Sequence, residues 1–167
     1  MPFLALEIKC QLTGVTDLAP NEPESFRWHL KLKCTNCGEA PDHWQYVVKS
    51  EMLDVPGSRG EANIVEKCKL CSRVNTLTML EDSFKSYKIE KNEEWQPLVI
   101  FDCRGIEPFD FDPRVDWNAH GAESTTTFND IDLSDKTWAD YDEKAGEAVE
   151  ISDIEVRFSH VKDPKKK

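Results

Sequence analysis

The chain has 167 residues, of which 32 are acidic and 21 are basic, so its formal net charge is −11. This excess of negative charge argues against a general nucleic-acid or membrane-surface binder, because phosphate groups attract a basic surface. Hydrophobic residues make up 39% of the sequence, which is ordinary for a folded domain and argues against wholesale disorder. No apolar run approaches the roughly 20 residues that a membrane-spanning helix needs.

The first hundred residues are predicted to form β-strands. Apolar residues occupy every second position from Leu4 to Leu12, which is the period of a half-buried strand. The same alternation runs from Phe26 to Lys33 and leads into the first cysteine motif. Further strands are expected at 44–48, 62–68 and 74–80. The first of these is rich in aromatic and β-branched residues, which favour strands, and the other two flank the second cysteine motif.

Two C-x-x-C motifs supply four cysteines, namely Cys34, Cys37, Cys68 and Cys71. Each motif lies at the turn between two predicted strands and can present two thiolates on one side of that turn. Four thiolates are the ligand set of a closed, tetrahedral, structural zinc site. Gly38 follows the first pair directly and suits a tight turn that requires a positive φ. The sequence therefore predicts one Zn2+ per chain, held by these four cysteines.

Other uses of paired cysteines fit this sequence less well. A thioredoxin-like redox pair requires a βαβ context, and neither motif has one. Two disulfides would suit a secreted protein, but the amino terminus lacks the basic and apolar regions of a signal peptide. A catalytic zinc keeps one open coordination position, and a zinc deaminase adds an H-x-E motif that this sequence lacks. We therefore expect a cytoplasmic location, with the nucleus as the alternative.

Two more cysteines, Cys10 and Cys103, each lie in or beside an apolar stretch and are predicted to be buried free thiols. Each also precedes a glycine that is followed by an aliphatic residue, Gly14 in one case and Gly105 in the other. Because a predicted strand leads into both segments, we infer a duplicated β-lobe in which only the first copy keeps the zinc. Chance similarity between β-rich segments is the alternative.

The second half contains three more predicted strands and two segments of mixed character. The strands are expected at 98–103, 128–133 and 149–158. Aromatic and acidic residues alternate over 107–113, which indicates a strand that buries its phenylalanines or, alternatively, an edge that binds a partner. The segment 134–148 begins like a capped helix and has few β-branched residues, so it predicts a short helix or an acidic loop.

Together these patterns predict an all-β, two-lobed, mainly antiparallel and sandwich-like fold. We expect a zinc-binding lobe at 1–92, a second lobe packed on it at 93–160, and a flexible basic tail at 161–167. Residues 101–167 carry 17 acidic and 9 basic side chains, which makes the second lobe acidic. Its expected surface for a basic partner comprises Asp110, Asp112, Asp140 and Asp142.

Several longer segments make the chain resemble a known family, the eukaryotic CXXC-motif-containing zinc-binding proteins. The segments that carry the resemblance are Phe26-Arg27-Trp28, Leu30-Lys31, Lys33-Cys34-Thr35-Asn36-Cys37-Gly38-Glu39, Trp44-Gln45-Tyr46, Lys67-Cys68-Lys69-Leu70-Cys71, Phe101-Asp102-Cys103-Arg104-Gly105-Ile106-Glu107-Pro108, Glu123-Ser124, Phe128 and Trp138-Ala139-Asp140-Tyr141-Asp142-Glu143-Lys144-Ala145. They span nearly the whole chain. The resemblance implies a two-lobed, mainly antiparallel β protein with zinc on Cys34, Cys37, Cys68 and Cys71, and it brings no established catalytic activity with it.

The sequence favours a non-enzymatic zinc protein that works as an adaptor or interaction module. We expect a monomer with a protein partner and without nucleic-acid or membrane binding. The alternative is a metal-handling or thiol-redox protein that uses the same cysteines. An enzyme is not expected, because the histidines show no spacing typical of a metal site or a catalytic triad. They are His29, His43, His120 and His160.

Overall fold

The computed structural model describes residues 2–164 and is built almost entirely from β-strands. Its strands are β1 (Phe3–Thr13), β2 (Val15–Pro20), β3 (Trp28–Cys34), β4 (Gln45–Val47), β5 (Leu53–Asp54), β6 (Glu61–Ala62), β7 (Ile64–Lys67), β8 (Val74–Met79), β9 (Gln96–Arg104), β10 (Ile106–Asp112), β11 (Trp117–Gly121), β12 (Thr127–Ile131), β13 (Trp138–Asp142) and β14 (Glu147–Val161). Two short 3-10 helices, η1 (Glu81–Ser83) and η2 (Ile89–Lys91), lie between β8 and β9. Within residues 2–164 no helix is long and apolar enough to cross a membrane.

The strands form three main sheets, and every strand pair in them is antiparallel. A six-stranded sheet has the order β13-β14-β1-β9-β8-β7, and two three-stranded sheets have the orders β10-β3-β4 and β12-β11-β2. A fourth, small sheet pairs β5 with β6. The alternating apolar residues of β1 are buried as its two-residue period requires, with Leu4, Leu6 and Ile8 at most 3% exposed. The predicted all-β, mainly antiparallel fold is confirmed.

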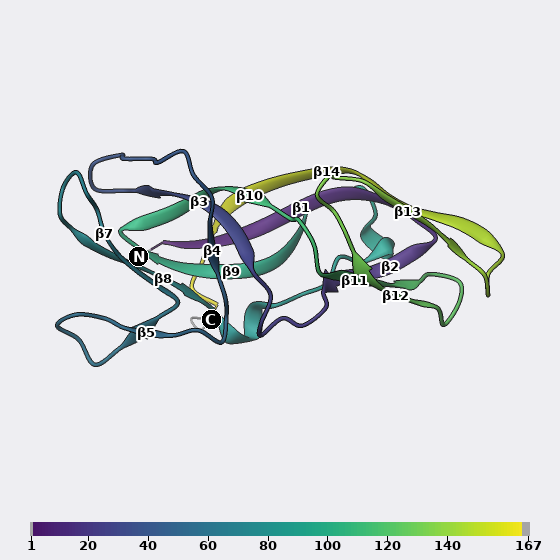
Figure 1. The fold of residues 1–167 in the computed structure, drawn as a ribbon, viewed down its shortest axis with the longest axis horizontal. Helices are drawn as coiled ribbons and strands as arrows, with labels where there is room; N and C mark the ends of the chain where they lie inside the picture. The colour runs from purple at the N-terminus through teal and green to yellow at the C-terminus, as the bar shows by residue number, and fades with distance from the viewer. Residues whose placement is uncertain (1, 165–167) are drawn as a thin grey trace.

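The strand order has an internal two-fold pattern. The central pair β1 and β9 is followed outward by β14 and β13 on one side and by β8 and β7 on the other. In the smaller sheets, β2 of the first half pairs with β11, and β10 of the second half pairs with β3. Figure 1 shows the result: β3, β4, β7 and β8 lie at the left end, and β2, β11, β12 and β13 lie at the right end.

The register of the strand pair β3–β10 matches that of the pair β2–β11 position by position. Ile106 lies opposite Cys34 in one sheet, and Val15 lies opposite Gly121 in the other. One residue further on, the Thr35 amide donates to the Gly105 carbonyl and the Ala122 amide donates to the Gly14 carbonyl, both at 2.9 Å. Gly14 and Gly105 are therefore equivalent positions, as the predicted repeat requires.

Cys10 and Cys103 are both buried, as predicted, with at most 1% of each residue exposed. They are not equivalent positions in the repeat, however. Cys10 precedes Gly14 by four residues, whereas Cys103 precedes Gly105 by two. The glycines carry the repeat because both have a positive φ, +71° and +90°, at the bend between two strands.

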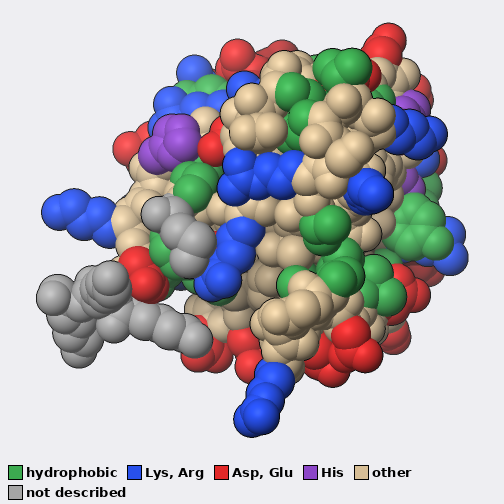
Figure 2. Space-filling model, turned by 90° about the vertical axis from the view of Figure 1, so that its left-hand side faces the viewer, with side chains coloured by type: hydrophobic (Ala, Val, Ile, Leu, Met, Phe, Trp, Pro, Cys, Tyr) green, Lys and Arg blue, Asp and Glu red, His purple; other side chains and the backbone are tan. Residues whose placement is uncertain are grey.

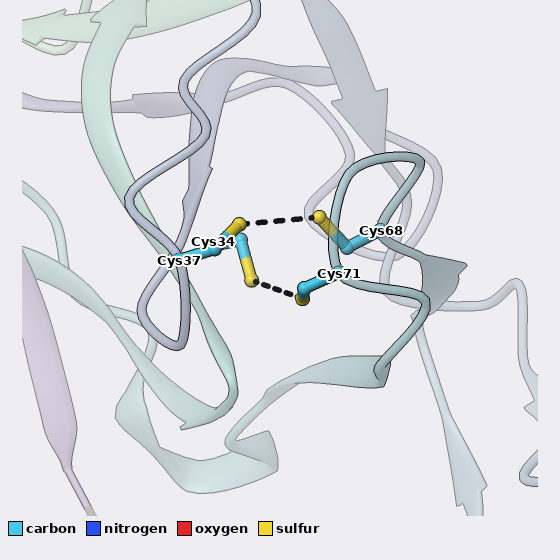
Figure 3. Close-up of side chains that lie close together, drawn as sticks. All are labelled: Cys34, Cys37, Cys68 and Cys71. Carbon is cyan, nitrogen blue, oxygen red and sulfur yellow. Dashed lines mark hydrogen bonds between the residues drawn. The ribbon is translucent and has the colours of Figure 1, made fainter.

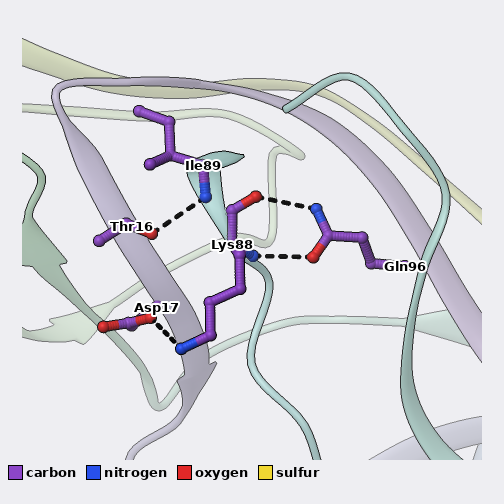
Figure 4. Close-up of polar contacts among 5 residues, drawn as sticks. All are labelled: Thr16, Asp17, Lys88, Ile89 and Gln96. Carbon is purple, nitrogen blue, oxygen red and sulfur yellow. Dashed lines mark hydrogen bonds and ion pairs between the residues drawn. The ribbon is translucent and has the colours of Figure 1, made fainter. Parts of the chain in front are cut away.

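Each half of the chain contributes strands to all three main sheets. The expected boundary near residue 92 falls in the connection between β8 and β9. This connection is held near its middle (Figure 4). The Thr16 hydroxyl accepts from the Ile89 amide at 3.0 Å, and the Gln96 side chain exchanges two hydrogen bonds of 2.9 Å with the backbone of Lys88. Lys88 also forms an ion pair with Asp17. The division into two lobes stays a prediction, and the shared sheets mean that strands of both ranges pair with one another.

Aromatic residues from both halves fill the space between the sheets. Trp28 and Trp117 lie 6.2 Å apart in a near-perpendicular arrangement, and Phe26 packs edge-on against both. Phe111 of β10 completes the group at 5.7 Å from Trp28. Such edge-to-face pairs stabilise beyond the area they bury, by about 0.5–1.5 kcal/mol each.

Three sequence expectations need correction or completion. The segment 134–148 is not a helix or an acidic loop, since β13 and the start of β14 form an antiparallel hairpin there. The segment 107–113 is a strand, but a bulge between Pro108 and Asp110 changes its phase. As a result Phe111 is buried while Phe109 remains 42% exposed. The predicted tail at 161–167 begins in β14 and ends outside the described residues.

Candidate metal centre

Two tight turns carry the four cysteines. The first follows β3, where the Gly38 amide donates to the Cys34 carbonyl at 2.8 Å and Gly38 has a φ of +80°. The second joins β7 to β8, where the Ser72 amide donates to the Cys68 carbonyl at 2.8 Å and Ser72 has a φ of +64°. The positive φ predicted for Gly38 is confirmed, and a serine adopts the same backbone conformation in the second turn.

The four sulfur atoms converge between these turns (Figure 3). Cys34 Sγ lies 3.7 Å from Cys71 Sγ, Cys37 Sγ lies 3.5 Å from Cys68 Sγ, and all four lie within 4.8 Å of one another. A tetrahedron with zinc–sulfur bonds of about 2.3 Å has edges of about 3.8 Å. A disulfide would need about 2.05 Å, and all four cysteines are free. The donor set and its spacing therefore fit zinc.

Hydrogen-bond donors around the sulfurs stabilise thiolate at two of the four positions. The Cys37 amide, together with the Asn36 amide and the Asn75 side chain, lowers the pKa of the Cys34 thiol to about 6. The Asn36 side chain and the Arg73 amide lower the pKa of Cys71.

The pKa of Cys37 is shifted in the opposite direction. The Glu39 amide lowers the pKa of Cys37, but partial desolvation of its sulfur and the three neighbouring sulfurs outweigh this effect and raise the pKa to about 12. Without metal the cluster would therefore keep a proton at neutral pH, and zinc must displace it on binding.

The cluster is accessible from outside. Cys34 is buried, Cys68 and Cys71 are partly exposed, and Cys37 is exposed. A half-open hollow of about 500 Å³ reaches the cluster from one side, where Cys34 and Cys68 form part of its wall. Leu32 and Ile106 line the hollow as well, together with the polar side chains of Gln45, Glu66 and Asn75.

The second half contains the same pair of turns without cysteines. The Gly121 amide donates to the Thr126 carbonyl at 2.8 Å, just as the Cys34 amide donates to the Glu39 carbonyl. The Gly146 amide donates to the Asp142 carbonyl at 2.8 Å, which matches the bond from Ser72 to Cys68.

A buried carboxylate joins these two turns. Asp142 is completely buried and accepts hydrogen bonds from Ser124 Oγ at 2.5 Å, from Thr126 Oγ1 at 2.6 Å, and from the amides of Lys144 and Ala145 at 3.1 Å. These donors, with Ser124 foremost, lower the pKa of Asp142. Asp142 therefore cannot belong to the acidic surface expected from the sequence. Sequence reasoning missed its role because the two hydroxyl groups that bind it lie 18 and 16 residues away.

The other candidate residues do not assemble into a site. Among residues 2–164, the four cysteines are the one group of three or more potential metal ligands. His43 lines the hollow beside the cluster, whereas the His29 ring lies tilted against the Tyr46 ring, with the centroids 5.8 Å apart. Ser124 and Thr126, which follow His120 in sequence, donate their hydroxyl groups to Asp142.

Comparison with known proteins gives a consistent result. A family model described as CXXC motif containing zinc binding protein, eukaryotic, matches residues 5–159. The chain is 69% identical to UPF0587 protein F46B6.12 of Caenorhabditis elegans over the full length of both proteins. It is 46% identical to the human CXXC motif containing zinc binding protein, over 95% of this chain and 98% of the human one.

Two solved structures share the fold. The crystal structure of C1orf123 superposes with a TM-score of 0.91 at 45% identity and covers 95% of this chain and 99% of that one. A hypothetical protein from Plasmodium falciparum superposes with a TM-score of 0.84 at 28% identity and covers 95% and 100% of the two chains.

Proposed function

The chain belongs to the eukaryotic family of CXXC motif containing zinc binding proteins, and we propose that its zinc is structural and that the protein acts without catalysis by binding another protein. In this proposal Cys34, Cys37, Cys68 and Cys71 hold one zinc ion per chain. The observation that carries it is the convergence of the four sulfurs within 4.8 Å from two turns far apart in sequence. Four thiolates would fill a tetrahedral shell and leave no open position for a substrate.

The internal repeat supports a structural role for the metal. In the second half the equivalent pair of turns is joined by the Asp142 carboxylate and its hydroxyl and amide donors. The cysteine cluster occupies the same place in the first half. A bound zinc ion would therefore do at one end of the molecule what a hydrogen-bonded carboxylate does at the other, namely fix two hairpin turns to each other.

Surface features support an interaction role. At the end of the molecule that carries the cysteines, Leu70 is 67% exposed and Val74 is 44% exposed, with Lys69 and Arg73 beside them. Figure 2 shows this end, where lysine and arginine side chains lie among apolar ones. Exposed apolar side chains flanked by charge are typical of protein contacts.

We propose a monomer in the cytoplasm, or alternatively the nucleus, as the working form. Elsewhere on the described surface the large exposed apolar side chains lie on separate segments, apart from the adjacent Met52 and Leu53, and scattered exposure of this kind is common on monomers. The six cysteines are free, and a reducing compartment would keep them so.

Metal analysis of the reduced protein tests the metal assignment. We expect one zinc per chain in the wild type and clearly less in Cys34→Ser, while Cys103→Ser serves as the control because this cysteine lies outside the cluster. A wild type without zinc, or a Cys103→Ser variant that loses it, would contradict the assignment.

Metal handling or thiol redox is the second candidate function. The exposure of Cys37 and the hollow that reaches Cys34 and Cys68 favour it, because a chelating partner or an oxidant could approach the sulfurs. The rate of zinc transfer to a chelator separates the two candidates. Slow exchange supports a structural metal, and rapid exchange supports handling.

A further inference from the structure

A buried asparagine side chain contacts one sulfur of the cysteine cluster. Asn75 lies on β8 and is 1% exposed, and its Nδ2 donates to Cys34 Sγ at 3.4 Å. Its other polar atom, Oδ1, is buried without a hydrogen-bond partner among the described residues. A buried carbonyl oxygen that loses its water without gaining a donor destabilises the folded state. The position therefore carries a cost that packing does not explain.

The second half of the chain shows what this position requires for folding alone. The Cys68 amide donates to the Arg73 carbonyl across the turn between β7 and β8, and Asp142 pairs with Glu147 across the turn between β13 and β14. Two residues further along each strand lie Asn75 and Val149, which are therefore equivalent.

The neighbouring glycines confirm the match. A Cβ on Gly105 would lie 2.0 Å from Asn75 Oδ1, and a Cβ on Gly14 would lie 2.8 Å from a methyl group of Val149. Both side chains thus fill the same slot beneath an equivalent glycine, and both are 1% exposed. The copy that has no cysteines fills this slot with valine, so the fold itself does not need an amide there.

We infer that Asn75 is a positioning residue of the zinc cluster, selected for its N–H···S hydrogen bond to Cys34 and not for packing. The inference rests on the proposed zinc site. An N–H donor stabilises negative charge on the sulfur and restricts its orientation, so the sulfur stays aimed at the metal. Groups that orient a ligand in this way commonly change metal affinity by about 10–100-fold when they are removed. This hydrogen bond also requires a glycine at position 105, because any side chain there would displace the Asn75 amide.

The test replaces Asn75 by the residue of the other copy. Asn75→Val should remain folded and hold one zinc, but it should release zinc to an excess of chelator roughly 10-fold faster or more. In the cobalt-substituted protein, the thiolate-to-cobalt absorption band should shift to longer wavelength, because the sulfur loses a hydrogen bond. Packing alone would not shift this band. Val149→Asn is the matched control and should lower the Tm without changing zinc release or the cobalt spectrum.

The outcomes separate this inference from the zinc assignment on which it rests. Asn75→Val with wild-type zinc release and an unshifted cobalt band would overturn the inference while leaving the zinc site intact. A wild type that holds no zinc, or a Cys34→Ser variant that keeps zinc unchanged, would overturn both. If the valine leaves a gap that prevents folding, Asn75→Leu has the same number of side-chain heavy atoms and provides the same comparison.

Discussion

Asp142 shows how one side chain can fix two turns without a metal. It is completely buried, and both of its carboxylate oxygens accept hydrogen bonds from groups on two separate turns. A buried carboxylate is tolerated only where donors replace its lost water. Here two hydroxyls and two amides do so, and the charge-assisted bonds they form are stronger than bonds between neutral groups.

Asp142→Asn should therefore destabilise the protein at neutral pH. The substituted amide carries no charge, so its hydrogen bonds are weaker, and its NH2 group donates where a carboxylate oxygen accepted, so one of the bonds from Ser124 and Thr126 must reverse. We expect a fall in Tm of roughly 5 °C, measured by thermal unfolding of the zinc-loaded protein. Glu143→Gln, at an exposed position in the same turn, is the control and should leave the Tm unchanged.

The Tm difference between the wild type and Asp142→Asn should depend on pH in a defined direction. Because its donors lower the pKa of Asp142 in the folded state, the carboxylate stabilises the fold above the unfolded-state value of about 3.9 and loses that effect as the pH falls through the folded-state pKa. The Tm difference between wild type and Asp142→Asn should thus be constant near pH 7 and shrink below about pH 4. A difference that grows on acidification would contradict this role.

The two cysteines outside the cluster should behave as inert core residues. Burial raises the pKa of Cys10 to about 12, although a hydrogen bond with Tyr87 opposes this, and burial also raises the pKa of Cys103. Both therefore stay protonated at neutral pH, when the thiolate is the reactive form. In folded protein freed of zinc, an alkylating reagent should modify only cysteines of the cluster and should reach Cys10 and Cys103 only on unfolding, as mass spectrometry would show. Rapid labelling of a fifth site would mean that the core opens more readily than its burial indicates.

At the level of elements, the two pairs of turns share a backbone but differ in what joins them. The equivalence places Gly121, Ser124, Asp142 and Ala145 where the first half has Cys34, Cys37, Cys68 and Cys71. A Cβ at Gly121 would point toward Ser124 Oγ and Asp142 Oδ2, at 2.2 and 2.7 Å. Side chains at these four positions would therefore converge on one point.

Cysteines at all four equivalent positions should create a second zinc site. The variant Gly121→Cys, Ser124→Cys, Asp142→Cys, Ala145→Cys removes the hydrogen-bonded carboxylate and supplies a tetrahedral thiolate set in its place. We expect two zinc ions per chain by elemental analysis. The matched control omits one change and keeps Ala145, and it should bind the second ion more weakly. One zinc per chain in the complete variant would show that the two pairs of turns differ in geometry.

The sequence predicted most strands because burial of alternate apolar residues governs them. It failed at β13, where Trp138 to Asp142 includes three exposed residues and is held by its pairing with β14 and by the buried Asp142. No local sequence pattern predicts such a strand. The bulge in β10 also escaped prediction, since a single extra residue shifts the buried face without leaving a signal in the alternation.

The four clustered cysteines were identifiable from sequence because their spacing is specific, whereas the groups that support them were not. Asn75 lies 41 residues from Cys34 and carries no motif. Its importance becomes visible only when strand pairing aligns it with Val149. The pairing of β2 with β11 and of β10 with β3 could not be predicted either, because sequence order favours pairing of neighbouring strands.

At the level of the whole molecule, the shared sheets limit how far the loss of zinc can spread. Structural zinc sites in small fingers supply about 10–16 kcal/mol of apparent binding free energy, and those fingers unfold without metal. Here β1 lies between β9 and β14, and the aromatic core draws on both halves. The central sheet therefore has support that does not pass through the cysteine cluster.

Removal of zinc by a chelator should accordingly loosen one end of the molecule. We expect amide hydrogen exchange to increase in the turns at 34–39 and 67–73 and to stay unchanged at 117–121 and 142–147, with a fall in Tm of more than about 10 °C. Hydrogen exchange measured by mass spectrometry would resolve these segments. Uniform loss of protection along the chain would mean that the metal supports the entire fold.

Charge is distributed unevenly along the length of the molecule. The end formed by β12, β13 and the start of β14, on the right in Figure 1, exposes many carboxylates and few basic groups. The exposed acidic residues on the hairpin of β13 and β14 are Asp140, Glu143, Glu147 and Glu150. A basic partner would be drawn toward this end over a distance of about 8–10 Å at physiological salt.

Neutralising that hairpin should slow the association of a basic partner more than it changes dissociation. For a partner recovered from cytosol with the wild-type protein, we expect the variant Asp140→Asn, Glu143→Gln, Glu147→Gln, Glu150→Gln to associate roughly 10-fold more slowly at low salt, because it loses electrostatic steering. The difference should vanish near 1 M salt, where the screening length is about 3 Å. A control that neutralises Glu51, Asp54, Glu61 and Glu81 removes the same charge from exposed positions outside the hairpin. If both variants slow association equally, net charge and not this surface steers the partner, and if neither does, the contact lies at the cysteine end.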